Sequence, residues 1–174
     1  QVRKKVKVPI SVKLSLLYTN PLHAIKRFAE AGAEGFVLFN RLFQPDIEPE
    51  QEKGAEGHLL SEAGSREPAL RYAGLLHGRV RGDVCANTGI LSGKDVAKML
   101  LAGAACVQVV STLYRNKTEH LRAMLAELEQ WMQRRGYPDL GSFRGRLSAQ
   151  NNQDPGFYRR AGYVKRLIRA DYAD

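Results

Sequence analysis

The chain has 174 residues, of which 44% are hydrophobic and 26% charged, a composition that fits one ordinary globular domain. No apolar run approaches the length of a membrane span, and the basic start QVRKKVKV lacks the apolar core and cleavage site of a secretory signal, so the sequence indicates a soluble protein. Two cysteines, Cys85 and Cys106, lie in apolar segments. We interpret them as small core residues and expect a reducing, cytoplasmic setting.

The formal net charge of +9 is concentrated near the two ends of the chain. Seven arginines and lysines lie between residues 144 and 169, and four more lie in the first seven residues. Such a balance can mark a nucleic-acid partner, but no aromatic residues alternate with these charges as they do in a base-stacking surface. We therefore predict solvated faces and expect no nucleic-acid or membrane partner. We also expect no metal site, because no metal-ligand spacing relates the four histidines His23, His58, His77 and His120.

The first part of the chain predicts strands at residues 8–14 and 35–40 with a helix between them. Asn20 and Pro21 supply an N-cap and a first-turn proline, and Gly32 ends the helix. The inward side chains of this helix are Leu22, Ile25 and Phe28. A polar stretch at 41–65 follows, acidic from Asp46 to Glu56, and it reads as a functional loop rather than core.

The second part continues the alternation of helix and strand. Helices are predicted at 66–76, at 93–102 and from Thr118 to Gly136, and strands at 83–89 and 106–110. In the last helix, the side chains predicted to be buried are Leu121, Met124, Leu125, Leu128 and Met132.

An internal repeat supports an α/β fold. The segment AEAGAEGFVLFN at 29–40 aligns without gaps on LLAGAACVQVVS at 100–111, and each contains a helix end, an Ala-Gly-Ala turn and a strand. Repeated βα units give a parallel sheet whose strands are buried on both faces. The sequence therefore predicts either an open sheet or part of a (βα)8 barrel.

Polar residues stand at the carboxyl ends of successive predicted strands, the edge that carries the active site in a barrel. These residues are Lys13, Asn40, Asn87, Thr88, Gly89, Ser111 and Thr112. The segments NTGILSG at 87–93 and STLY at 111–114 are rich in small residues, which let backbone N–H groups approach a phosphate. No strand is followed by G-x-G-x-x-G, which argues against a dinucleotide-binding unit.

Several segments together resemble the carboxyl-terminal half of a dihydroorotate dehydrogenase, most closely the cytosolic class and its relatives. The segments that carry the resemblance are VPISVKL, VLFN, TGILSGKDVAKMLLAGAACVQVVSTLY, LAELEQWMQRRGY and FRGRLS. The resemblance implies an FMN-dependent oxidoreductase of pyrimidine biosynthesis on a (βα)8 TIM barrel. This chain would supply the last four βα units at 1–148, followed by a basic amphipathic helical tail at 149–174.

The resemblance also implies roles for single residues. Lys13 would lie beside the pyrimidine edge of the flavin, where a cation stabilises the negative charge that develops as hydride from a dihydropyrimidine reaches N5. A bound anion would compensate the burial of this lysine. Asn40 would hydrogen-bond the substrate, with Arg41 beside it. The loops that cradle the FMN phosphate would contain Asn87, Thr88, Gly89, Ser111 and Thr112.

The chain departs from the family pattern at three places. Arg41 replaces a small polar residue, Asn87 and Thr88 replace smaller residues, and Val110 stands where a glycine is usual. The family's catalytic base belongs to the other half of the barrel, and neither Cys85 nor Cys106 substitutes for it, so we expect this chain alone to be inactive.

A four-stranded half-barrel has two open edges, so we expect either a missing amino-terminal half or self-association as the partner. The tail is a candidate cap, with Phe157, Ala161, Val164 and Ile168 on one helical face. Alternative functions are an FMN-dependent tRNA-dihydrouridine synthase-like enzyme and a non-catalytic phosphate- or flavin-binding remnant. Simpler interpretations also stay open: Lys13 extends to solvent, Asn40 and Ser111 cap elements, and Gly89 and Gly93 only form turns.

Overall fold

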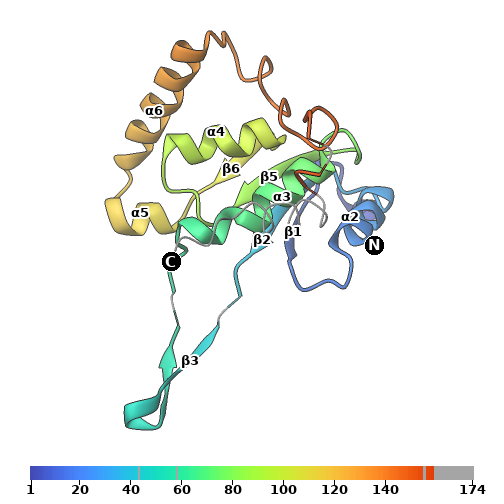
Figure 1. Ribbon diagram of the computed structural model, residues 1–174. Helices are drawn as coiled ribbons and strands as arrows, with labels where there is room; N and C mark the ends of the chain where they lie inside the picture. The colour runs from blue at the N-terminus through green and yellow to red at the C-terminus, as the bar shows by residue number, and fades with distance from the viewer. Residues whose placement is uncertain (43, 58, 155, 159–174) are drawn as a thin grey trace.

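The computed structural model describes residues 1–42, 44–57, 59–154 and 156–158. One parallel sheet has the strand order β1-β2-β5-β6 (Figure 1). Its members are β1 (Ser11–Ser15), β2 (Gly35–Asn40), β5 (Asp83–Asn87) and β6 (Cys106–Gln108). Each connection between neighbouring strands contains a helix, so the α/β class with repeated βα units is confirmed.

The crossover helices are α2 (Pro21–Glu30), α3 (Glu67–Leu76) and α4 (Gly93–Ala102). Two of them begin with the side-chain caps expected of such helices. Asn20 accepts the His23 N–H at 3.1 Å, and Ser92 accepts the Asp95 N–H at 3.2 Å. The helix α6 (His120–Arg135) ends at Gly136, as predicted. Two short helices, α1 (Val2–Lys5) and α5 (Ser111–Asn116), were not predicted.

The core lies between the crossover helices and one face of the sheet. Its fully buried members include Phe36, Leu38, Ile25, Ala73 and Met99. A second cluster, formed by Ala97, Leu100, Leu128 and Phe143, joins α4 to α6 and to the segment that follows α6. Figure 1 shows α6 lying over α4. The core therefore sits on the helix side of the sheet.

Burial along α6 is narrower than the sequence predicts. Met124 and Leu128 are buried, but Leu121 is 38% exposed and Leu125 is 66% exposed. The prediction that these two leucines are buried is wrong, because α6 packs on the ten-residue helix α4 through one narrow stripe.

The opposite face of the sheet is open at both edge strands. Lys13 in β1 is exposed, as are Cys106 and Gln108 in β6, and Leu14 is the fully buried residue of β1. Three predictions are therefore wrong: burial of β1 and β6 on both faces, burial of Lys13, and a core position for Cys106. Cys85 is 8% exposed, which confirms its core position.

An antiparallel hairpin occupies the stretch predicted to be a loop. Its strands β3 (Pro45–Glu48) and β4 (Lys53–Glu56) flank the turn η1 (Pro49–Gln51) and project from the body in Figure 1. A second 3-10 turn, η2 (Ala63–Arg66), leads into α3. The stretch stays outside the core, as predicted. Its two strands were not predicted, because proline and acidic residues are uncommon in strands.

The segment that follows α6 packs back against the helices that cover the sheet. Ala149 N–H donates to Gly74 O at 2.9 Å, and the Tyr158 hydroxyl donates to Leu147 O at 2.6 Å. The described part of the predicted helical tail, residues 149–154 and 156–158, forms turns and no helix, and Phe157 is 40% exposed. Residues 159–174 lie outside the described residues. Within the described part of the chain, no helix combines the length and apolar character that crossing a membrane requires.

Candidate functional site at the carboxyl ends of the strands

A cavity of about 200 Å³ opens at the carboxyl ends of the four strands. We call it the strand-end cavity. Among the residues predicted for the site, its walls contain Lys13, Asn40, Arg41, Asn87, Thr88, Gly89 and Ser111. Thr112 is not in this wall: it is 1% exposed and its hydroxyl donates to Leu91 O at 3.4 Å. The fold thus brings together polar residues from every strand of the sheet.

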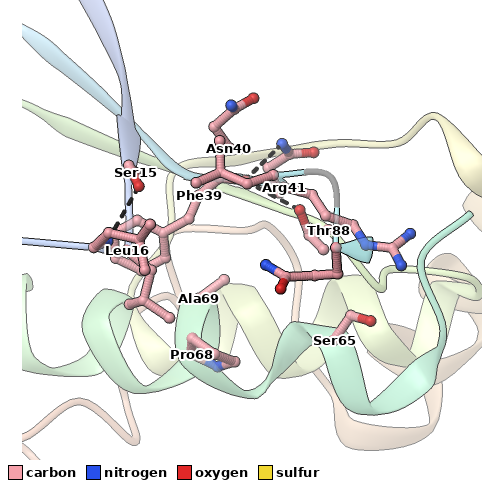
Figure 2. Close-up of a pocket in the computed structure, with 13 residues that line it drawn as sticks. Ser15, Leu16, Phe39, Asn40, Arg41, Ser65, Pro68, Ala69 and Thr88 are labelled. Carbon is pink, nitrogen blue, oxygen red and sulfur yellow. Dashed lines mark hydrogen bonds between the residues drawn. The ribbon is translucent and has the colours of Figure 1, made fainter. Parts of the chain in front are cut away.

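The turn after β5 is held in an unusual backbone conformation. Thr88 and Gly89 have φ angles of 76° and 70°, and a β-branched residue in this region costs about 1–3 kcal/mol. Two side-chain bonds to one carbonyl support it: Asn87 Nδ2 donates to Phe39 O at 3.2 Å and Thr88 Oγ1 donates to the same oxygen at 3.1 Å. These bonds, dashed in Figure 2, fix the ends of β2 and β5 relative to each other.

Ser61 links the two loops predicted to cradle a phosphate. Its hydroxyl accepts the Gly89 N–H at 3.1 Å and donates to Ser111 Oγ at 2.9 Å, while its own N–H donates to Ser111 Oγ at 2.8 Å. Ser61 is 6% exposed. The Gly89 N–H is therefore already bonded. Ser111 accepts both bonds, which leaves its hydroxyl hydrogen for a ligand.

Sequence reasoning missed Ser61, since it lies in the polar stretch predicted to be a loop and its partner Ser111 is 50 residues away. The arrangement is stabilised further by Arg115, whose Nη1 donates to Ser61 O at 3.0 Å. No local pattern in the sequence signals such a contact.

Asp95 anchors the loop between β5 and α4. Its carboxylate accepts the Leu91 N–H at 3.2 Å and the Ser92 hydroxyl at 3.0 Å, and Arg66 Nε lies 3.4 Å from Oδ1. Burial favours the neutral acid, but these hydrogen bonds, together with Arg66 and Lys98, hold the Asp95 pKa below its usual value. The ionised carboxylate therefore fastens this wall of the cavity.

Gly93 serves packing at the start of α4. Its N–H donates to Glu127 Oε2 at 2.8 Å, so α6 already satisfies this donor. A Cβ at this position would collide with the backbone oxygen of Met124. The structure therefore directs Gly93 toward α6 rather than toward the strand-end cavity.

A second cavity, of about 210 Å³, lies between the end of β2 and the start of α3 (Figure 2). Its apolar lining includes Leu16, Phe39, Pro68 and Ala69. Four residues line both cavities: Asn40, Arg41, Asn87 and Thr88. In Figure 2 the Asn40 side chain points away from α3. The guanidinium of Arg41 is held by a bond from Nη1 to Leu59 O at 2.8 Å.

The donors of the strand-end cavity suit an anion, since a lysine ammonium, a serine hydroxyl and an asparagine amide face it. Its volume of about 200 Å³ is below the roughly 300–1,000 Å³ of most small-molecule pockets. The strand-end cavity therefore suits a phosphate-sized anion better than a whole nucleotide cofactor. Among the described residues, no three His, Cys, Asp or Glu side chains are grouped to hold a metal ion.

Comparisons with curated proteins identify relatives of the chain. It is 28% identical over 149 residues to the catalytic subunit of dihydroorotate dehydrogenase B (NAD(+)) from Geobacter sp. (strain M21). The aligned region covers 84% of this chain and 48% of that protein. The chain is therefore similar to dihydroorotate dehydrogenases over most of its length. The resemblance seen in the sequence is thereby confirmed.

Two further dihydroorotate dehydrogenases agree with this assignment. The corresponding subunit from Citrifermentans bemidjiense is 29% identical over 134 residues, or 75% of this chain and 44% of that protein. Dihydroorotate dehydrogenase (fumarate) from Kluyveromyces lactis is 36% identical over 72 residues, or 41% of this chain and 22% of that protein. No protein-family model matches the chain. The chain spans about half the length of the curated dihydroorotate dehydrogenase B subunits it matches.

Proposed function

We propose that this chain is the carboxyl-terminal half of an FMN-dependent (βα)8-barrel oxidoreductase that acts on the CH–CH bond of a dihydropyrimidine such as dihydroorotate. The observation that carries the proposal is the convergence of Lys13, Asn40, Gly89 and Ser111 on one cavity at the carboxyl ends of four parallel strands. The homology to dihydroorotate dehydrogenases supports it. So does the strand order, which is that of four consecutive βα units.

The residues of the cavity have separate roles in this proposal. Ser111 donates its hydroxyl hydrogen to the phosphate of FMN, and the turn at Thr88 and Gly89 shapes the cradle around it. The Lys13 ammonium would supply positive charge that stabilises a bound, reduced flavin. FMN, when bound, supplies the hydride acceptor. Asn40 orients the substrate through its amide group.

Arg41 extends the substrate side of the site. Because its guanidinium is anchored on Leu59 O at 2.8 Å, it presents a fixed positive charge beside Asn40. A guanidinium recognises a carboxylate through paired N–H donors. We therefore propose that the substrate is a dihydropyrimidine that carries a carboxylate.

The partner in this proposal is the amino-terminal half of the barrel, or a second copy of the chain. Edge strands β1 and β6 each have one neighbour in the described sheet, and Lys13, Cys106 and Gln108 are exposed beside them. Unpaired strand edges favour association with another chain. Sedimentation at several protein concentrations should detect self-association, and a monomer at every concentration would favour the amino-terminal half.

A titration of FMN into the purified chain, followed by flavin fluorescence and visible absorbance, tests the proposal. The wild-type chain should bind FMN, and Lys13→Ala should weaken binding by about 10- to 150-fold, since a charged hydrogen bond contributes about 1.5–3 kcal/mol. Lys26→Ala, at an exposed position of α2, is the matched control and should bind as the wild type does. Equal affinities for Lys13→Ala and Lys26→Ala would contradict the role given to Lys13.

The limited volume of the cavity favours a second candidate, a phosphate-binding domain without catalysis. A cavity of about 200 Å³ accommodates a phosphate group more readily than an isoalloxazine ring. In that case inorganic phosphate would bind as tightly as FMN, and the flavin absorbance spectrum would not change on binding.

A further inference from the structure

Cys85 and Cys106 face each other across the open side of the sheet. They are direct partners in the parallel register of β5 and β6, which lie side by side in Figure 1. Neighbouring strands lie about 4.8 Å apart, and a disulfide needs a Cα separation of about 4.4–6.8 Å. Both cysteines are free thiols. The register therefore places the two Cα atoms within the range of separations that a disulfide spans.

The two thiols differ in access and in reactivity. Cys106 is exposed, whereas Cys85 is 8% exposed. Burial raises the pKa of Cys85 to about 12, the neighbouring Cys106 thiol adds to this rise, and the Lys13 ammonium lowers it. Because the thiolate is the nucleophile, Cys106 is the thiol that attacks first and Cys85 the one that completes the bond.

We propose that Cys85 and Cys106 are a thiol–disulfide exchange site that closes to an intramolecular disulfide by reducing a low-molecular-weight disulfide such as oxidised glutathione. The Cys106 thiolate attacks one glutathione sulfur, a mixed disulfide forms, and the first glutathione leaves as a thiolate that takes a proton from water. Cys85 then loses its proton to water and attacks the Cys106 sulfur, and the second glutathione leaves. Two protein thiols are oxidised, and one glutathione disulfide is reduced to two thiols.

The cysteine pair is not among the residues that line the strand-end cavity. It lies on the open face of the sheet, in the same register row as Lys13 and Val37. Closure would attach the edge strand β6 to β5 and remove an exposed thiol from this face. The proposal applies to the chain with β6 uncovered, because a barrel half associated with that edge strand would cover Cys106.

The test exposes the reduced full chain to oxidised glutathione at neutral pH, alkylates the remaining thiols and measures the intact mass. The wild type should lose two hydrogen atoms, take up no alkyl group and keep no glutathione, and peptide mapping should find Cys85 joined to Cys106. Cys85→Ala is the matched control and should retain one glutathione on Cys106. Cys106→Ala should react much more slowly, because its remaining thiol is buried.

Two outcomes would overturn the proposal. A wild-type chain that retains glutathione on Cys106, as the Cys85→Ala control does, would show that the strands do not allow closure. A disulfide between the Cys106 residues of two chains would show that the exposed thiol reacts outside this pair. Repeating the reaction in urea tests whether disulfide formation depends on the folded sheet. Closure should slow when the register of β5 and β6 is lost.

Discussion

The two faces of the same four-stranded sheet differ sharply. On the helix side, Phe36 and Leu38 of β2 are fully buried, and Ala86 of β5 is buried beside them. On the opposite side, the row that starts at Lys13 ends at the exposed Cys106. Alternate residues of a strand point to opposite faces of the sheet, so each short strand contributes side chains to both faces. One face is packed, and the other carries the lysine and the thiols.

This difference shows how stability and chemistry are divided. The packed face supplies apolar burial, and the open face with the carboxyl ends of the strands holds the polar groups. Replacements on the packed face should therefore change stability, and replacements on the open face should change ligand binding.

The largest expected effect is on the packed face. Phe36→Ala should lower the free energy of unfolding by about 3–5 kcal/mol, because it leaves a cavity where a fully buried ring was. Gln108→Ala, at an exposed position of β6, should change it by less than about 0.5 kcal/mol. Urea unfolding followed by circular dichroism measures both values, and equal losses would mean that the two faces are packed alike.

The contact between α4 and α6 gives the next effect. Gly93→Ala should cost about 1–3 kcal/mol, because the new Cβ would collide with backbone atoms of α6 and at least one helix must shift. Gly64→Ala is the control, since a Cβ there meets nothing within 4 Å. The same urea titration applies, and an unchanged Gly93→Ala midpoint would show that α6 does not approach α4 this closely.

Asp95 makes stability depend on pH. Its pKa is lowered in the folded chain, so its contribution is present above the unfolded value of about 3.9 and is lost as pH falls through the folded pKa. Asp95→Asn should cost about 1.5–3 kcal/mol at pH 7, the range for hydrogen bonds to a charged group. The gap from wild type should close as the pH is lowered below about 4. A gap that stays constant with pH would contradict an ionised anchor.

The smallest effect on stability belongs to Lys13. Lys13→Ala should change the free energy of unfolding by less than about 0.5 kcal/mol, because the side chain is exposed on the open face. The same variant is expected to weaken FMN binding. Thermal unfolding without ligand checks the first statement, and a large loss there would indicate that the lysine is part of the packing.

Elements with clear end signals could be predicted from the sequence. The helix from Gly93 to Ala102 and the strand from Gly35 to Asn40 have the predicted limits. The helix has well-defined limits because Ser92 caps its amino end and Gly103, with a φ of 126°, ends it. The strand ends of the site were also predictable, since parallel strands bring their carboxyl ends to one edge.

Features that depend on distant contacts could not be predicted. Whether Leu125 is buried depends on how far α4 extends beneath α6. The hydrophobic periodicity of α6 carries no information about the length of α4. Ser61 bonds to residues far along the chain, and the burial of Lys13 depends on what covers the second face. Cys106 sits in an apolar run, but its place on an edge strand leaves it exposed.

The measurement that most directly tests the account follows backbone amide NMR signals while FMN is added to the chain. The account predicts that the signals of Lys13, Thr88, Gly89 and Ser111 shift together and saturate at one FMN concentration, while those of α2 stay in place. Shifts that spread over the basic surface, or that leave these four residues unchanged, would contradict a phosphate site at the strand ends.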